Sequence, residues 1–386
     1  MRYEDFSDAS PGNLVPTVFN ARAFVPDPLP PEFDLAEVAL PLAQAHRKLG
    51  ELKGACRRLS NPYVLIRPLQ RLEAQTSSAM EGTHTTADKL ALAEAGVKKE
   101  IDNETKEVSN YIAALEQAMR GLPDNPITHR TLKSAHETLL GGVGRARGED
   151  KLPGCFKRDQ NMIGGHTLEK ARFIPPPPTY VADAISSLES YINEPRKDRD
   201  DLIDIALVHY QFETIHPFAD GNGRVGRMLI SLMAISRGLL DVPALYVSPA
   251  LEGVKDEYIE RLYRVSAFGE WPEWLNFFCE AVCRTSERAV RTIDSIIALQ
   301  DKYRQIAAQV SQSANLQQVV DMIFEGPIIR PKDIIDRTNV TDAAARQMLA
   351  KLVEAEILHE YRGVYPRVWI ALELLELSTP STDGDL

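Results

Sequence analysis

Apolar residues recur at helical spacing along most of the chain. Between residues 35 and 52 they are separated by steps of three and four, which is typical of one face of an amphipathic helix. A second helix is predicted to open with Pro68 at its first position and to stop at Gly82. The same spacing predicts further helices over residues 104–121, 130–140, 179–193, 201–213, 224–238 and 255–268. The pattern therefore predicts a mainly α fold.

Strand patterns are scarce. The clearest lies between Gln160 and Pro175, where the Gly164-Gly165 pair separates two short runs in the manner of a hairpin turn. The prolines at 175–178 then exclude both helical and strand hydrogen bonding. The proline-rich segment before residue 32 has no period and predicts an extended arm over a globular body. We expect a mostly helical protein with one exposed β-hairpin.

The C-terminal part of the chain has a different pattern. Three short helical segments and then two strand-like runs are predicted, at residues 316–324, 331–337 and 341–354 and at residues 357–361 and 364–370. Thr341 is expected to cap the third helix. Three helices and a two-stranded wing predict a winged helix-turn-helix. The tail after Ser378 is predicted to be disordered.

Length, charge and cysteine content narrow the class of protein. The 386 residues, 44% of them hydrophobic, can bury the cores of two or three domains. The net charge of -11 disfavours contact with phosphate backbones and acidic membranes. No run reaches membrane-spanning length and the N-terminus has no signal-peptide pattern, so we expect a cytoplasmic protein without a membrane contact. Its cysteines are expected to be buried thiols, namely Cys56, Cys155, Cys279 and Cys283.

Residues 216–227 contain the pattern that indicates chemistry. Gly221 and Gly223 flank Asn222, which allows consecutive backbone N–H groups to face one concavity that favours phosphate oxygens. The helix that follows directs the positive end of its dipole to the same place. Phosphate binding is therefore the first expectation for this loop.

Charged side chains in the same segment extend this expectation. Arg224 and Arg227 are three residues apart, so they lie on one helical face and can hold further phosphates. Asp220 offers a carboxylate to Mg2+. His216 lies upstream, where a general base can reach a nucleophile that approaches the bound phosphate. Together these residues predict phosphoryl or nucleotidyl transfer.

Two other patterns in the chain are weaker. Residues 221–226 satisfy the G-x-G-x-x-G dinucleotide fingerprint, but that fingerprint requires a preceding strand and residues 202–212 are spaced as a helix. His136 and Glu137 begin a zinc-protease pattern, yet Leu140 stands where its second histidine would be. We interpret both as coincidences of sequence.

The segment 216–227 resembles the signature of the Fic family of protein adenylyltransferases, H-x-F-x-(D/E)-G-N-G-R-x-x-R, at every fixed position. The resemblance implies a helical Fic-fold core that transfers AMP from ATP to a Ser, Thr or Tyr hydroxyl of a target protein. It implies that His216 is the base and that Asp220 holds Mg2+. The phosphate-binding residues that it implies are Gly221, Asn222 and Gly223 for an anion hole and Arg224 and Arg227 for the β- and γ-phosphates.

Two further segments resemble the family. The hairpin at 160–175 is similar to a flap that aligns the target backbone by strand addition. The flap residues implied in this way are Met162, Ile163, Gly164 and Gly165. Ser77, Glu81 and Gly82 are similar to the inhibitory motif (S/T)-x-x-x-E-(G/N), whose glutamate pairs with the second arginine of the signature. We therefore expect Glu81 to pair with Arg227 and to inhibit transfer.

The predicted organisation has four parts: an N-terminal arm and helical inhibitory region (1–100), a Fic catalytic core (101–300), a linker helix with the winged helix (301–378) and the tail (379–386). Residues 316–370 carry seven basic and eight acidic side chains, which favours protein contact, such as a homodimer, over DNA binding.

Two alternative functions stay open, a nucleotide-sensing transcriptional regulator and a hydrolase that removes AMP from protein. The presence of His216 argues against a pure sensor.

Overall fold

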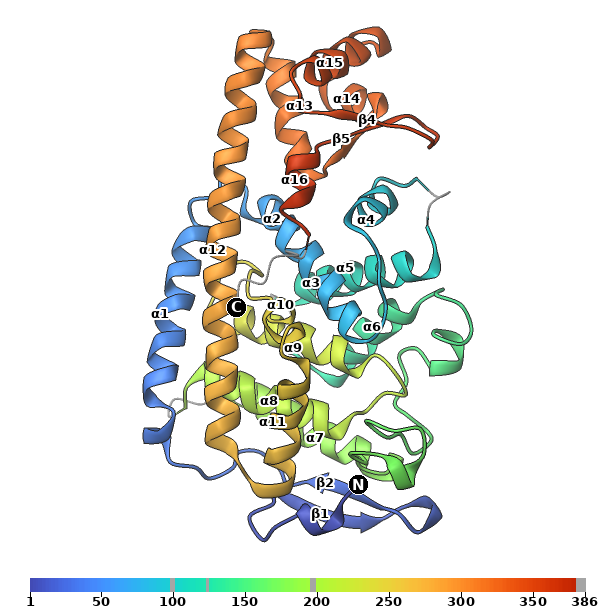
Figure 1. The fold of residues 1–386 in the computed structure, drawn as a ribbon, viewed down its shortest axis with the longest axis vertical. Coiled ribbons are helices and arrows are strands. Elements are labelled where there is room, and N and C mark those ends of the chain that lie inside the picture. Colours follow the sequence, from blue (N-terminus) through green and yellow to red (C-terminus); the bar gives the residue numbers. More distant parts are fainter. Residues whose placement is uncertain (98–100, 123–124, 195–198, 380–386) are drawn as a thin grey trace.

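The computed structural model describes residues 1–97, 101–122, 125–194 and 199–379, and most of these residues are helical (Figure 1). The helices are α1 Ala39–Cys56, α2 Pro62–Leu65, α3 Arg67–Met80, α4 Ala87–Glu94, α5 Asn103–Gly121, α6 His129–Leu140, α7 Pro178–Asn193, α8 Asp201–Ile215, α9 Asn222–Ser236, α10 Ser248–Glu252, α11 Lys255–Phe268, α12 Trp271–Val310, α13 Ala314–Glu325, α14 Pro331–Thr338, α15 Asp342–Glu354 and α16 Leu372–Glu376. The mainly α prediction is confirmed.

Helices α8 and α9 form the centre of the main helical body. Every residue of α8 after Asp201 is buried, as expected for a helix that is packed on all sides. Asp200 caps α8, because its Oδ1 accepts the N–H groups of Leu202 and Ile203 at 2.8 and 3.3 Å. Helix α9 packs beside α8 and is approached by α3, α5 and α6. The loop between α8 and α9 is thus held at a fixed place.

Helix α12 is the longest element of the structure. Its 40 residues extend about 60 Å, along α1 at one end and α13 at the other (Figure 1). Trp274 is fully buried and its Nε1 donates to the Ala206 carbonyl at 3.1 Å, which fixes α12 on α8. The helix runs without a break through residues 300 and 301, where the sequence predicts a boundary between domains.

The expected helix at 35–52 begins later, because Asp34 caps a separate 3-10 turn at Leu35–Glu37.

The N-terminal arm differs from the prediction. It contains an antiparallel hairpin of β1 Gly12–Pro16 and β2 Arg22–Pro26, in which Leu14 lies opposite Phe24. Prolines stand at the strand ends, where a missing N–H costs least, so the proline content did not exclude pairing. Phe24 is fully buried against Phe6 and Phe173, with ring centroids 5.3 and 5.8 Å apart.

The expected hairpin at 160–175 is present only in part. One bridge joins Ile163 to Phe173, with N–H···O distances of 2.9 and 3.1 Å, and this segment contains no named strand. Glycine is required in the turn at Gly165, since a Cβ there would lie 2.7 Å from the Lys170 carbonyl oxygen.

The expectation that all four prolines exclude a helix was wrong. Pro178 is the first residue of α7, where no N–H is needed.

The C-terminal region has the predicted helices α13, α14 and α15, and Thr341 caps α15 by accepting the Ala344 N–H at 3.3 Å. Its strands are shorter than predicted and form an antiparallel sheet in the order β3-β5-β4: β3 Ile328–Ile329, β4 His359–Tyr361 and β5 Val368–Ile370. Strand β3 and helix α16 were not predicted. The assignment to the winged-helix class stays a prediction. Residues 380–386 of the expected disordered tail lie outside the described residues.

Two bulk expectations can be compared with the structure. Cys56 and Cys279 are buried and Cys283 is half-buried, but Cys155 is exposed in a loop that follows a 3-10 turn, so the expectation of four buried thiols was wrong for Cys155. None of the helices in the described part of the chain combines the length and the apolar character that a membrane crossing needs.

Candidate active site

The loop between α8 and α9 is built by a sharp turn and an asparagine clasp. His216 ends α8 in the left-handed conformation, with a φ of 50°, and its N–H reaches the Phe212 carbonyl at 3.0 Å. Asn222 then accepts the Phe218 N–H at 2.8 Å and donates to the Phe218 carbonyl at 2.9 Å. The side chain of Asn222 therefore holds the loop closed, and its backbone begins α9.

The anion site differs in detail from the expectation. Helix α9 begins at Asn222 rather than at residue 224, so only Gly221 has a positive φ and Gly223 lies in the first helical turn. The first N–H groups of a helix have no partner within it, and they carry the positive end of the dipole. A Cβ at Gly223 would overlap the Glu81 carboxylate and lie 2.8 Å from Arg227 Nη1. Glycine is thus needed here for close approach of an anion.

The two arginines of the loop have different partners. Arg224 is fully buried and pairs with Glu107 of α5, and its Nη2 is 3.5 Å from Asp220 Oδ1. Arg227 is 2% exposed and donates to the Ser77 hydroxyl and carbonyl, both at 2.8 Å. Each guanidinium is therefore held in place from a neighbouring helix.

Glu81 lies against Arg227. Its Oε1 accepts from Arg227 Nη2 at 2.9 Å, and Gly82, with a φ of 80°, turns the chain away after α3. Burial alone would raise the pKa of Glu81, but the charge and hydrogen bond of Arg227 outweigh it, so this pKa is lowered. The structure thus brings Ser77, Glu81 and Arg227 together as an ionised cluster.

His216 is suited to accept a proton. Its Nδ1 donates to the Glu213 carbonyl at 3.1 Å, which fixes the tautomer and leaves Nε2 as the acceptor. Burial, followed by the nearby charge of Lys157, lowers the pKa of His216 to about 4. The imidazole is neutral at pH 7, as a general base must be.

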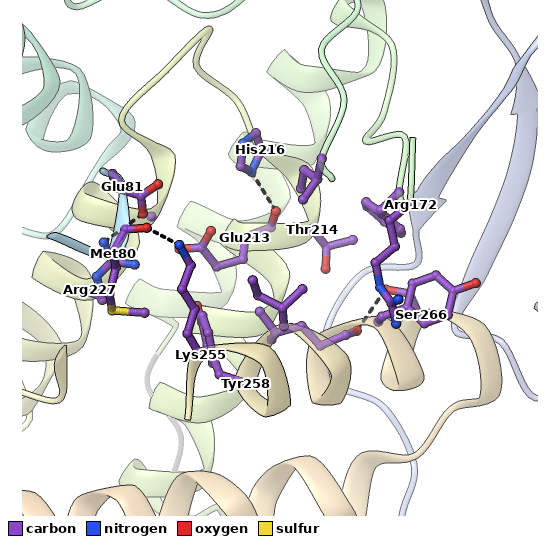
Figure 2. A pocket seen from close by; sticks show the side chains of 16 residues that line it. Met80, Glu81, Arg172, Glu213, Thr214, His216, Arg227, Lys255, Tyr258 and Ser266 are labelled. Atoms are coloured by element: carbon purple, nitrogen blue, oxygen red, sulfur yellow. Dashed lines mark hydrogen bonds and ion pairs between the residues drawn. The ribbon is translucent and has the colours of Figure 1, made fainter. Parts of the chain in front are cut away.

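Of the site residues, Glu81, His216, Gly223 and Arg227 line one pocket (Figure 2). Glu81, Arg227 and Met80 lie at one end, with His216 above Glu213. Of the expected flap residues, Ile163 contributes to the pocket lining, whereas Gly164 and Gly165 are exposed. Met162 packs instead in a small cluster with Ala21, Ala171 and Ile174.

Sequence reasoning missed several residues that support the site. His136, which we had dismissed with the zinc-protease pattern, stacks on Phe218 at 3.9 Å and its Nε2 lies 3.0 Å from the Asp220 carbonyl. Glu213 lines the pocket, and burial raises its pKa to about 8. Lys157, just before the flap, and Asn161, at its start, contact the loop. These contacts join residues far apart in sequence, so no local pattern indicated them.

Asp220 fits a role in binding Mg2+. Its side chain is 33% exposed, and its Oδ1 accepts the Gly221 N–H at 2.6 Å. Among the described residues no group of three acidic, histidine or cysteine side chains gathers as a metal site. A single carboxylate at the edge of an anion site suits Mg2+, which takes most of its other ligands from phosphates and water.

A helix N-terminus with two buried arginines, one carboxylate and a histidine is chemically suited to phosphate groups, and it stands at the centre of a mainly helical fold. Residues 40–120 match the family model Fic/DOC family N-terminal, and residues 126–234 match the model Fic/DOC family. The chain belongs to the Fic/DOC family, as its sequence indicated.

The chain is similar to curated proteins over part of its length. It is 29% identical over 195 residues to protein adenylyltransferase Fic of Culex quinquefasciatus, a match that covers 47% of this chain and 36% of that protein. It is 42% identical over 91 residues to a probable protein adenylyltransferase of Aquifex aeolicus, covering 24% of this chain and 27% of the other. The matches thus span about a third of the length of these relatives.

Solved structures share the fold. A Fic family protein from Desulfovibrio desulfuricans aligns with a TM-score of 0.58 and 19% identity, over 89% of this chain and 98% of that chain. A Fic domain containing signaling protein from Bacteroides thetaiotaomicron aligns with a TM-score of 0.51 and 18% identity, over 66% of this chain and 97% of that chain. At these identities the likeness concerns the fold alone.

The histidine chemistry gives a first prediction. Because burial lowers the pKa of His216 to about 4, its ring should stay neutral down to pH values well below the ordinary 6.5. The unfolded chain takes up a proton at higher pH than the folded one, so His216 should reduce stability as the pH falls below about 6.5. NMR titration of the ring, assigned with His216→Ala, measures this directly. A midpoint at or above the ordinary value would contradict the geometry.

Proposed function

We propose that this protein transfers AMP from ATP to a hydroxyl side chain of a target protein. The observation that carries the proposal is the imidazole of His216, whose Nδ1 donates to the Glu213 carbonyl and which lines the same pocket as Gly223 in the first turn of α9. Base and anion site are thus adjacent, as an in-line attack on a phosphate requires. The names of the similar curated proteins support the same activity.

The proposed reaction is an attack of the target hydroxyl on the α-phosphorus of ATP. His216 Nε2 accepts the proton of the target hydroxyl while its oxygen forms a bond to the α-phosphorus of ATP. The bond between the α-phosphorus and the bridging oxygen breaks, and pyrophosphate leaves with that electron pair. The products are AMP-protein and pyrophosphate, with one proton released from the imidazolium later. The backbone N–H groups at the start of α9 stabilise the negative charge of the phosphates.

The charged side chains have separate proposed roles. Arg224 and Arg227 hold the β- and γ-phosphates, and Asp220 holds Mg2+, which neutralises phosphate charge when bound. Ile163 on the flap lies in the pocket lining, where a target backbone can align beside it. Glu81 forms an ion pair with Arg227. We propose that this ion pair inhibits transfer in the resting protein.

The proposal predicts which phosphate of ATP labels the target. Glu81→Gly protein, incubated with Mg2+ and lysate, should transfer label from the α-position of ATP to protein. His216→Ala in the same background should lower the rate by roughly 100-fold or more, because general-base catalysis is lost. Transfer of label from the γ-position alone would indicate a kinase and reject AMP transfer.

The inhibitory role of Glu81 is a separate prediction. Glu81→Gly should raise the rate of AMP transfer by roughly 10-fold, since removal of a competing contact favoured by about 1.4 kcal/mol would shift an equilibrium tenfold. Glu81→Gln, which keeps the shape but removes the charge, should give a smaller gain. Equal rates for the wild type and both variants would remove the inhibitory role. Release of AMP from labelled protein by the wild type but not by Glu81→Gly would favour the hydrolase alternative.

The C-terminal region is proposed to contact protein rather than DNA. Four of its basic side chains are paired with acidic neighbours: Arg330 with Asp333, Arg337 with Glu325, Arg346 with Asp342 and Arg367 with Glu360. Paired cations release few counterions from DNA, which weakens binding. A partner protein or a second copy of the chain suits such a surface better.

A gel shift with full-length protein tests this assignment. Mixed double-stranded DNA should show no retardation even at about 50 mM salt, where phosphate contacts are strongest. Retardation that disappears as salt is raised would instead favour the regulator that acts on DNA.

A further inference from the structure

Lys157 is a buried cation behind the catalytic loop. Its residue is 4% exposed, and its Nζ donates to Asn161 Oδ1 at 2.6 Å and reaches the Ile215 carbonyl at 3.4 Å. Its backbone N–H donates to the Pro217 carbonyl at 2.8 Å. Burial lowers the pKa of Lys157 to about 7. An apolar side chain would fill the same space without the cost of desolvating an amine. Packing alone therefore does not account for a lysine at this position.

Asn161 completes the contact from the same segment. Its Nδ2 donates to the His216 carbonyl at 3.0 Å and to the Phe218 carbonyl at 3.1 Å. The backbone carbonyls of residues 215, 216, 217 and 218 therefore all receive a donor from Lys157 or Asn161. Two residues outside the loop thus hold it at four consecutive positions, at Pro217 through the backbone N–H of Lys157 and at the other three through side chains.

The backbone at His216 needs such support. A positive φ is uncommon for residues other than glycine, and it persists only where the surroundings enforce it. If the carbonyl anchors were lost, the turn could relax and the ring would leave its place beside α9. A displacement of about 1 Å at a reacting group can lower a rate by about 100-fold.

The charge of Lys157 also acts on the ring. Three charged groups influence the pKa of His216. The charge of Lys157 lowers this pKa, whereas the charges of Glu81 and Asp220 raise it. Glu213 and Lys255 also line the pocket, and burial of Glu213 favours its neutral form. Loss of the Lys157 charge should therefore raise the pKa of His216.

We propose that Lys157 and Asn161 are positioning residues for His216, which hold its backbone turn and join the base to the target flap. Asn161 lies at the start of the flap hairpin at 160–175, so the segment proposed to align the target and the loop that carries the base share one anchor. The kinetic part of this inference rests on the proposed AMP transfer. The contacts with the loop do not depend on it.

The test compares three variants in the Glu81→Gly background. Lys157→Met removes the charge at similar length, Lys157→Arg keeps the charge, and Asn161→Ala removes the amide that binds the carbonyls. Lys332→Met, at an exposed position in α14, is the matched control. For each protein, kcat, the KM for ATP, the melting temperature and the NMR titration of the His216 ring in the absence of nucleotide are measured.

Lys157→Met and Asn161→Ala should lower kcat by roughly 10- to 100-fold and change the KM for ATP by less than about 3-fold, because the base moves and the anion site does not. Lys157→Met should also move the acid limb of the pH profile and the titration of His216 to higher pH. Lys157→Arg should restore most of kcat, and Lys332→Met should equal its parent.

Two results would overturn the inference. One is an unchanged kcat in both Lys157→Met and Asn161→Ala. The other is a loss of kcat that Lys157→Arg does not restore and that leaves the His216 titration unchanged, since a general loss of fold would act in that way. If the parent itself transfers no AMP while the titration still shifts, the proposed function fails and the positioning role stands.

Discussion

A buried arginine must have an anion, and this constraint governs the site. Arg227 is 2% exposed and its guanidinium is always charged, so an unpaired state would be costly. The Ser77 oxygens accept two of its hydrogen bonds, but only Glu81 supplies a negative charge among its hydrogen-bond partners. Any phosphate that binds Arg227 must therefore replace Glu81 or share the cation with it. The inhibitory role that we propose for Glu81 follows from the same requirement.

Arg224, the other arginine of the loop, is paired with a carboxylate that is itself buried. Arg224 pairs with Glu107, which is itself 1% exposed and also contacts Arg147 at 3.3 Å. No rotation of an exposed side chain can release this pair, so Arg224 is a fixed charge. The site thus combines one arginine paired with a buried carboxylate and one paired with a partly exposed carboxylate. Gly223 leaves room for the second pair, because a Cβ at this position would overlap the Glu81 carboxylate.

Local sequence patterns predicted what is local in this structure. The stripe and cap signals placed α5, α7, α8 and α11 to within about two residues, and α9 begins two residues before the predicted position 224. The β1–β2 hairpin was missed because its stability comes from Phe24 packing on Phe173, far along the chain. Lys157 and Asn161 were missed for the same reason, since their value to the loop exists only after α8 and the flap have come together. Contacts between residues far apart in the chain produce no periodic pattern in the sequence.

Helix α3, which carries Glu81, is itself firmly held. Glu73 accepts from the Tyr111 hydroxyl at 2.8 Å and from the Ser248 N–H at 3.0 Å, and Arg71 pairs with Glu94 at 2.6 Å. Glu81 differs, because it follows the last helical residue and its side chain is 34% exposed. Rotation of the Glu81 side chain breaks its ion pair with Arg227 but leaves these helix contacts in place, whereas a shift of α3 would break several of them. The structure therefore favours release of Arg227 by rotation of the Glu81 side chain, with the helix remaining in place.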